Sequence, residues 1–429
     1  MERLRSIWVA LGLAVVLRLM FIVVPGWESV DADESKYHSL ATSILEGQGY
    51  SWGGAPDADW PPLYPIFLSA IYFVFGRGAT AVYCFQALLG AATAYGVYRL
   101  SLSIFEDERG AALSAFVIAG YPLLIFLNKS LLSENLYVPL LIWHLYFLHQ
   151  GLARNSPRHL TTSAALLGLT ALTRSFIAPI VVTYGVMFLV ILPGRFASRL
   201  RAGLSYAMVF GLMLLPWTIR NYIVFEELVP LTTSMGSTLY AGYSMSDYTY
   251  GNSPHDEVAR VAGQVQQLEG RVAANRYLMQ ESLRIIAEHP SRVPALVAKK
   301  AAYFMMPFDY DILPRFPDGS NPGFNSPYVF FFPFFLVGVW QAYRARCLIS
   351  PLLVVMGYTL VMCMLILGLP RYRLPVEPIM VLFACFALVS YWRHPNRRLV
   401  GGLAGAYGVC ALLLGFYRAE MKEWLASFL

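Results

Sequence analysis

Hydrophobic residues fill most of the chain in stretches that approach twenty residues, separated by short polar segments. A helix needs about 20 such residues to cross the hydrocarbon core of a bilayer. The pattern therefore predicts an all-α polytopic membrane protein with about eleven transmembrane helices. We expect these helices at residues 6–25, 78–105, 110–128, 131–150, 159–176, 177–193, 200–222, 328–344, 348–368, 371–391 and 398–417.

Two segments do not fit a simple bundle. In the first outer loop, residues 27–77, apolar side chains recur at helical spacing within 33–45, which predicts a helix along the membrane surface. The apolar run 63–75 is too short to cross a bilayer and follows a double proline, so we expect an interfacial or re-entrant helix there.

The second segment, residues 225–327, is long and polar. Its patterns predict helices at 256–267, 271–288 and 294–306. We therefore divide the chain into an N-terminal transmembrane module (1–224) that holds the loop 27–77, a small helical extracytoplasmic cap (225–327), and C-terminal transmembrane helices (328–429).

Composition supports a chain dissolved in lipid. Hydrophobic residues make up 57% and charged residues 14% of the sequence, against roughly 25% charged in a soluble domain. This excludes a soluble enzyme. The five cysteines have no metal-ligand spacing, and we interpret them as small packing residues.

The net charge of +6 reports orientation rather than a nucleic-acid partner. If the N-terminus is cytoplasmic, every predicted inner segment carries arginine, for example Arg154, Arg199 and Arg344. We therefore predict a multi-pass protein of the inner (cytoplasmic) membrane, with its N-terminus in the cytoplasm.

The outward-facing charges are few, and a charge near the bilayer usually has a partner or a function. They include Asp31, Asp33, Glu34, Lys36, Asp59, Lys129, Glu134, Arg174, Arg220, Arg371 and Arg373. Four cations contradict the positive-inside trend and either bind an anion or anchor to lipid phosphates: Lys129, Arg174, Arg220 and Arg371.

A metal site is not predicted. Asp31-Ala-Asp33 resembles the metal-binding signature of enzymes that use nucleotide sugars, but those substrates are cytoplasmic and this segment is expected outside. The outer histidines lack zinc spacing. No cofactor is required by the sequence, and a divalent metal has only weak support.

Several strings occur in an order that resembles one family. They are DESKYHSLATSILEGQGY, PPLYP, SENLY, ALTRSFIAP, LLPWTIRNYIVF with PLTTSMG, and RYRLPVEPIM. This set resembles the membrane glycosyltransferases of the C superfold, and among them glycosyltransferase family 39 and its relatives, the protein O-mannosyltransferases and the aminoarabinose transferases.

The resemblance implies transfer of one sugar from a polyprenyl-phosphate donor to an acceptor on the outer face of the membrane. The acceptor is a glycolipid, an envelope polysaccharide or a protein. The resemblance implies Asp33 as the catalytic base, Glu34 beside it, and Glu134 as a second acidic group. The substrate-binding residues expected from the outward charges and these strings are Asp31, Tyr37, Asp59, Tyr64, Lys129, Arg174, Arg220, Asn221, Arg371, Tyr372 and Arg373.

The chain departs from the aminoarabinose transferases, which carry glutamate and lysine before the double proline where this chain has Asp59 and Trp60. Other cations must then hold the carrier phosphate. We expect direct displacement with inversion, in which Arg220 and Arg371 neutralise the phosphate and Glu134 orients the acceptor or the sugar. The alternatives are a transporter or flippase for lipid-linked sugars, and an oligosaccharide ligase or polymerase.

Overall fold

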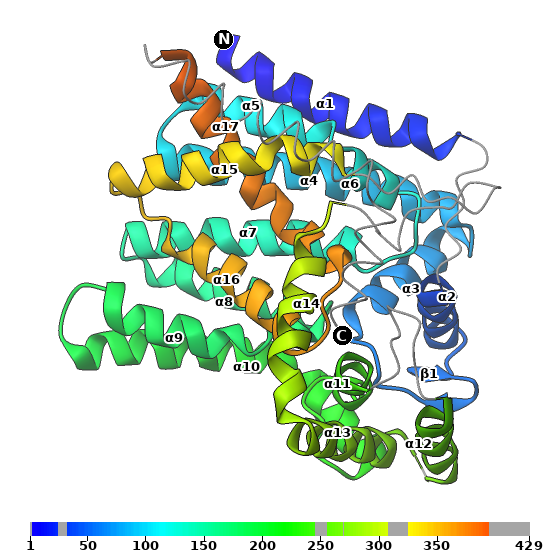
Figure 1. The fold of residues 1–429 in the computed structure, drawn as a ribbon. Coiled ribbons are helices and arrows are strands. Elements are labelled where there is room, and N and C mark those ends of the chain that lie inside the picture. Colours follow the sequence, from blue (N-terminus) through cyan, green and yellow to red (C-terminus); the bar gives the residue numbers. More distant parts are fainter. Residues whose placement is uncertain (1, 25–31, 245–254, 269, 308–324, 394–429) are drawn as a thin grey trace.

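Long helices run side by side as a bundle, with shorter helices and one small hairpin at one end (Figure 1). The computed structural model describes residues 2–24, 32–244, 255–268, 270–307 and 325–393. The predicted all-α fold is confirmed. The bundle contains α1 (Glu2–Ile22), α4 (Ala79–Phe105), α5 (Glu108–Ala119), α6 (Pro122–Leu127), α7 (Glu134–Ala153), α8 (Pro157–Ala171), α9 (Ile180–Ile191), α10 (Phe196–Phe225), α15 (Ser326–Arg344), α16 (Ser350–Leu365) and α17 (Glu377–Arg393).

Three helical segments of the described chain are long and apolar enough to cross a membrane: Ala79–Phe105, Phe196–Phe225 and Pro370–Tyr391. Four shorter segments are also apolar: Ser6–Ile22, Leu63–Phe75, Ser175–Ile191 and Ser350–Leu365. The number of eleven transmembrane helices therefore stays a prediction. The span expected at 398–417 lies outside the described residues.

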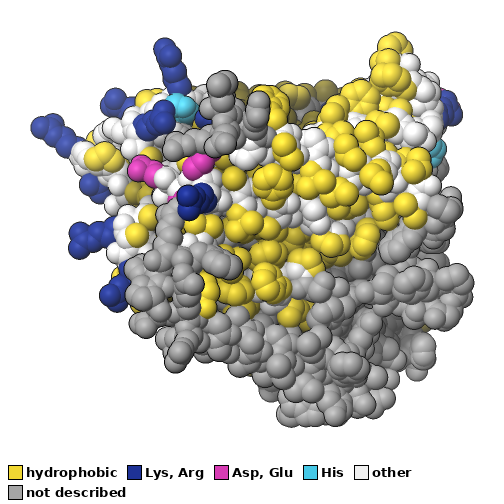
Figure 2. Space-filling model, turned by 90° about the horizontal axis from the view of Figure 1, so that it is seen from above, with side chains coloured by type: hydrophobic (Ala, Val, Ile, Leu, Met, Phe, Trp, Pro, Cys, Tyr) yellow, Lys and Arg dark blue, Asp and Glu magenta, His cyan; other side chains and the backbone are white. Residues whose placement is uncertain are grey.

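One face of the molecule separates apolar from charged side chains. Figure 2 shows hydrophobic side chains across the middle of this face. Most of the Lys and Arg side chains in view gather at the left, the end of the bundle away from the short helices. This distribution agrees with the positive-inside pattern of the sequence.

Two of the expected spans are interrupted, the first of them by a proline. Within 110–128, α5 ends at Ala119 and Tyr121 is extended (φ −69°, ψ 111°), because the residue before a proline is pushed out of the helical region. In the second case α8 ends at Ala171, Arg174 is extended (φ −145°, ψ 112°), and a short 3-10 helix, η1 (Ser175–Ile177), precedes α9. Arg174 therefore lies in the extended segment between two helices.

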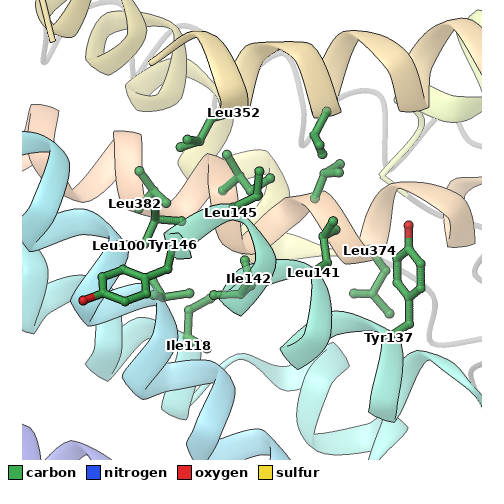
Figure 3. Close-up of a cluster of buried hydrophobic side chains, with 14 of the residues drawn as sticks. Leu100, Ile118, Tyr137, Leu141, Ile142, Leu145, Tyr146, Leu352, Leu374 and Leu382 are labelled. Carbon is green, nitrogen blue, oxygen red and sulfur yellow. The ribbon is translucent and has the colours of Figure 1, made fainter. Parts of the chain in front are cut away.

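Helix α7 lies at the centre of the bundle. Figure 3 shows Leu141 and Leu145 of α7 among Leu100 of α4, Leu352 of α16 and Leu382 of α17, and all five side chains are fully buried. Close van der Waals packing of this kind holds helices together where lipid removes the hydrophobic driving force. The packing also fixes the position of the residue that begins α7.

The short elements form an outer module at one end of the bundle. They are α2 (Ala32–Leu45), β1 (Ser51–Trp52), β2 (Ala55–Pro56), α3 (Leu63–Phe75), α11 (Met235–Tyr243), α12 (His255–Gln267), α13 (Arg271–Glu288), η2 (Pro290–Arg292), α14 (Val293–Met305) and η3 (Pro370–Val376). Five expected helices are confirmed to within one residue, namely 33–45, 63–75, 256–267, 271–288 and 294–306. Helix α11 and the hairpin are additions. Gly53 and Gly54, at φ 62° and 80°, make the hairpin's tight turn.

Candidate active site

An arginine lies between two carboxylates where the bundle meets the outer module. Arg371 Nε donates to Glu134 Oε1 at 2.5 Å, and Arg371 Nη1 lies 3.1 Å from Asp33 Oδ2. Glu134, the first residue of α7, is fully buried. The Asp33 side chain, in the first turn of α2, keeps 37% of its area exposed. Three distant parts of the chain thus meet at one guanidinium.

Arg174 adds a second positive charge to this group. Its Nη1 pairs with Glu134 Oε1, the same oxygen that Arg371 contacts. The Arg174 guanidinium carbon lies 5.5 Å from the ring centroid of Tyr372, a cation–π contact that holds it in place. Two arginines share one buried carboxylate, and Asp33 balances the remaining positive charge.

Asp33, Arg174 and Arg371 line a cavity of about 480 Å³, whereas Glu134 is not among its lining residues. Asp33 and Tyr37 come from α2, Asp59 precedes the double proline, and Arg371 comes from η3. Other parts of the wall are apolar and come from η1, α9, α11 and α16: Phe176, Pro179, Met235, Met362 and Ile366. The cavity is therefore amphipathic, since both charged and apolar side chains line it.

Two tyrosines support the charged wall. Tyr37 is buried, and desolvation raises the pKa of its phenol well above the usual value. It packs edge-on to Tyr64, with ring centroids 5.0 Å apart. Tyr64 is fully buried and donates its hydroxyl to Gln86 Oε1 at 2.8 Å, so it does not line the cavity. Tyr64 thus supports the wall from behind.

A second charge cluster lies beside the first. Asp59 lies 3.0 Å from Lys36 Nζ and pairs with Arg271 of α13. Fully buried Asp57 lies within 3.3 Å of Lys36 and 3.0 Å of Arg271. Lys36 also lies 4.4 Å from the ring centroid of Trp52. The cluster joins the first outer loop to the cap.

The site residues suggested by the sequence do not include Lys36, Asp57 or Arg271. The only local signal is the acidic pattern around Asp57 and Asp59. Asp59 is the one member shared with the cavity wall. Its two cationic partners come from α2 and α13, so these ion pairs could not be predicted from the sequence around Asp59.

Arg220 and Asn221, at the outer end of α10, bind backbone. Arg220 donates to the carbonyl oxygens of Asp57 at 2.8 Å and Tyr50 at 2.7 Å. Its guanidinium carbon lies 4.9 Å from the Trp217 ring centroid. Asn221 is fully buried and donates to the carbonyl oxygen of Val229 at 3.0 Å. Both residues hold loops in place by these hydrogen bonds, and neither lines the cavity.

Arg373 is placed away from the cavity that Arg371 lines. Arg373 is 1% exposed, donates to Glu377 at 3.0 Å and to the carbonyl oxygen of Met306 at 3.0 Å, and also bonds the Phe304 carbonyl oxygen. A 3-10 helix has three residues per turn, so side chains two positions apart point in different directions. Arg373 therefore fixes η3 against the end of α14.

Three further predicted residues lie outside the cavity wall. Half-buried Lys129 donates from Nζ to the carbonyl oxygen of Val24 at 2.6 Å, at the end of α1. Glu34 follows Asp33 on α2 but is not among the cavity-lining residues. Asp31 lies outside the described residues. Among the described residues, no three His, Cys, Asp or Glu side chains form a group that could hold a metal ion.

Comparison with known proteins finds one matching family model. Residues 59–219 match the family model of dolichyl-phosphate-mannose-protein mannosyltransferases. The predicted family resemblance is confirmed. The matched segment contains Asp59, Glu134 and Arg174, whereas Asp33 and Arg371 lie on either side of it.

The fold is also similar to solved membrane glycosyltransferases. The oligosaccharyltransferase of Archaeoglobus fulgidus matches 99% of this chain, with 15% identity and a TM-score of 0.55. AglB of the same organism, solved with an inhibitory peptide and a dolichol-phosphate, gives 16% identity, 99% coverage and a TM-score of 0.54. In each case this chain spans 55% of the other protein's length.

ArnT of Cupriavidus metallidurans, solved bound to undecaprenyl phosphate, matches 90% of this chain and 77% of its own, with 14% identity and a TM-score of 0.45. No curated protein sequence matches the chain.

Proposed function

We propose that this protein transfers a single sugar from a polyprenyl-phosphate donor to an acceptor at the outer face of the cytoplasmic membrane. The observation that carries the proposal is that Asp33, Arg174 and Arg371 line an amphipathic cavity, with buried Glu134 paired to both arginines. The charged wall suits a phosphate, and the apolar wall suits the first isoprene units. AglB, which shares the fold, was solved with a dolichol-phosphate.

The arginines supply the electrostatic part of the proposed mechanism. A polyprenyl phosphate sugar carries one negative charge, and the carrier phosphate approaches two when the bond from the anomeric carbon to the phosphate oxygen breaks. Cations at that oxygen therefore stabilise the transition state more than the ground state. One charge pair at 4 Å contributes about 4 kcal/mol at an effective dielectric of 20, before desolvation. Arg174 and Arg371 are the cations that line the cavity.

Arg220 takes no part in this scheme, because it does not line the cavity and instead donates to two carbonyl oxygens of the first outer loop. Glu134 acts by holding Arg174 and Arg371 side by side, which their mutual repulsion opposes. This role replaces the orientation of acceptor or sugar expected from the sequence. Glu134 is fully buried and both arginines lie against it.

Asp33 is proposed as the general base. Its carboxylate is part-exposed and lines the cavity, so it can accept the proton of an acceptor hydroxyl as that oxygen attacks the anomeric carbon. The carrier leaves as a phosphate monoester and needs little protonation. A single displacement of this kind inverts the anomeric configuration.

Purified protein, a polyprenyl phosphate sugar labelled in the sugar, and membrane extract as acceptor provide the test. Asp33→Asn should lower the transfer rate at least a hundredfold while donor binding is kept, because general-base contributions are typically 10²–10⁴. Ser35→Ala, an exposed neighbour on α2, is the matched control and should retain activity. Transfer by folded Asp33→Asn protein at the wild-type rate, or product with retained configuration, contradicts the mechanism.

A ligase or polymerase that uses an oligosaccharide donor is the second candidate, since the similar archaeal structures are oligosaccharyltransferases. Supplying a polyprenyl diphosphate oligosaccharide beside the monophosphate sugar separates the two. We expect turnover of the monophosphate donor only. A transporter would move either lipid across a vesicle membrane without forming a glycosylated product.

A further inference from the structure

A cavity of about 310 Å³ lies at the end of the bundle opposite the candidate active site. It lies between the start of α8, the end of α9 and the first turns of α10. From Arg201 on its wall to Arg220 beside the first outer loop, α10 rises about 28 Å, at 1.5 Å per residue. That length is close to the roughly 30 Å thickness of a bilayer's hydrocarbon core, so the cavity lies near the other membrane surface.

The cavity wall is polar and positively charged. Its polar side chains are Asn155, Thr161, Ser198, Arg199, Arg201 and Ser205. Arg199 is fixed at the wall, because its Nε donates to the Gly194 carbonyl oxygen at 3.1 Å and its Nη1 to that of Leu189 at 2.9 Å. Exposed Arg201 has no ion-pair or hydrogen-bond partner among the described residues. No acidic side chain lines this cavity.

A second hollow of about 370 Å³ continues from the first along the exposed face of α10. Arg201 and Ser205 line both spaces. The rest of the second wall is mainly apolar, with Leu204 and Met208 each 62% exposed and Leu200 40% exposed. These positions recur four residues apart, so they form one stripe on the helix.

Together the two spaces suit an amphiphile, a molecule with a charged head and an apolar tail. A cationic cavity with hydroxyl donors lies at the membrane surface, and an apolar groove runs from it along a face of α10. We infer that this is a binding site for an anionic phospholipid, with its phosphate between Arg199 and Arg201 and an acyl chain against Leu204 and Met208. The positive end of the α10 dipole adds to the attraction.

The inference does not depend on the proposed sugar transfer, because the two sites lie at opposite ends of α10. The cavity wall contains two arginines and no carboxylate, so it favours a ligand with net negative charge. A zwitterionic lipid has no net charge. A free phosphate cannot use the apolar groove. The site should therefore discriminate against both.

Native mass spectrometry of the full chain in detergent tests the proposal, with phosphatidylglycerol and phosphatidylcholine as probes at equal concentrations. Wild-type protein should retain one phosphatidylglycerol more tightly than phosphatidylcholine. Arg201→Gln should weaken that retention about fivefold, on the basis of roughly 1 kcal/mol for each basic residue at an anionic membrane surface. Ser205→Glu, which puts a carboxylate into both spaces, should weaken it further.

Arg344→Gln is the matched control, because Arg344 is an exposed arginine at the end of α15 and lines neither space. It should retain the lipid like wild type. Equal retention of the two lipids by wild type, or equal losses in Arg201→Gln and Arg344→Gln, would overturn the proposal. Displacement of the lipid by glycerol phosphate at an equal concentration would also overturn it, since the groove would then contribute nothing.

Discussion

Replacing Glu134 by glutamine isolates the charge balance of the candidate active site. Glutamine keeps the shape of the side chain but removes the charge that holds Arg174 and Arg371 together. Each pair is worth about 4 kcal/mol at 4 Å and an effective dielectric of 20, before desolvation. Removing one partner of a buried ion pair typically costs about 3–5 kcal/mol, because the other charge stays buried. We expect Glu134→Gln to lose that amount from a total stability of about 5–15 kcal/mol.

Thermal unfolding in detergent, followed by tryptophan fluorescence with and without sugar-free polyprenyl phosphate, measures the effect. The carrier's phosphate should raise the melting temperature of Glu134→Gln more than that of wild type, because the anion replaces the missing carboxylate beside two cations. Asp33→Asn is the matched control. Asp33 pairs with the same Arg371 but is part-exposed, so its loss should cost no more than about 1 kcal/mol.

Two results would refute this reasoning. A Glu134→Gln protein that melts at the wild-type temperature would show that the carboxylate does not offset the two buried arginines. A carrier effect no larger in Glu134→Gln than in wild type would show that the arginines do not bind the phosphate, even if the stability loss were as expected.

Three further predictions concern residues outside that pair of arginines. Arg220→Lys should destabilise the protein by about 1–3 kcal/mol in thermal unfolding with donor affinity unchanged, since lysine keeps the charge but cannot span both carbonyl oxygens; weaker donor binding in a stable variant would contradict the loop-fastening role. Burial lowers the pKa of Lys300, in α14, to about 7. Between about pH 7 and 10.5 the unfolded chain then binds more protons at this residue, so stability should rise with pH in that window; Lys300→Met should flatten the rise, and an unchanged slope would contradict it. Gly338→Ala should destabilise by at least about 1–3 kcal/mol, because a Cβ would lie 2.1 Å from the Phe383 carbonyl oxygen, whereas Gly357→Ala, with open space around it, should be neutral or stabilising in the same unfolding assay.

Much of the helix pattern could be predicted from the sequence because it depends on local chemistry. The helices expected at 63–75 and 271–288 have the same bounds as α3 and α13. Length of apolar run, helical spacing and proline stops are enough for such elements. Helix α11 was not predicted, since its segment mixes serine, threonine and glycine with apolar residues. The packing of α11 on α13, where Gly236 N–H donates to Asn275 Oδ1 at 2.6 Å, supports it instead.

The candidate site was predicted only as a set of outward charges at helix ends. Lys129, Arg174, Arg220 and Arg371 all contradict the positive-inside trend, and the sequence assigned the phosphate to Arg220 and Arg371. In the structure, Arg220 donates to backbone carbonyl oxygens and Lys129 donates to the end of α1. Arg174 and Arg371 form ion pairs with Glu134. The choice depends on the break after α8 and on the rotation of η3, and both follow from how the helices pack.

The sequence by itself indicated that this chain lies in a membrane and predicted its orientation there. Apolar runs and the placement of arginine are properties that a chain carries before it folds, because hydrocarbon excludes charge wherever the segment lies. Tertiary structure decided which charges meet. Asp33 and Arg371 are 338 residues apart in the chain, yet their side chains lie 3.1 Å apart because α2, α7 and η3 converge at one end of the bundle. A contact between residues so far apart in the chain depends on how these elements pack.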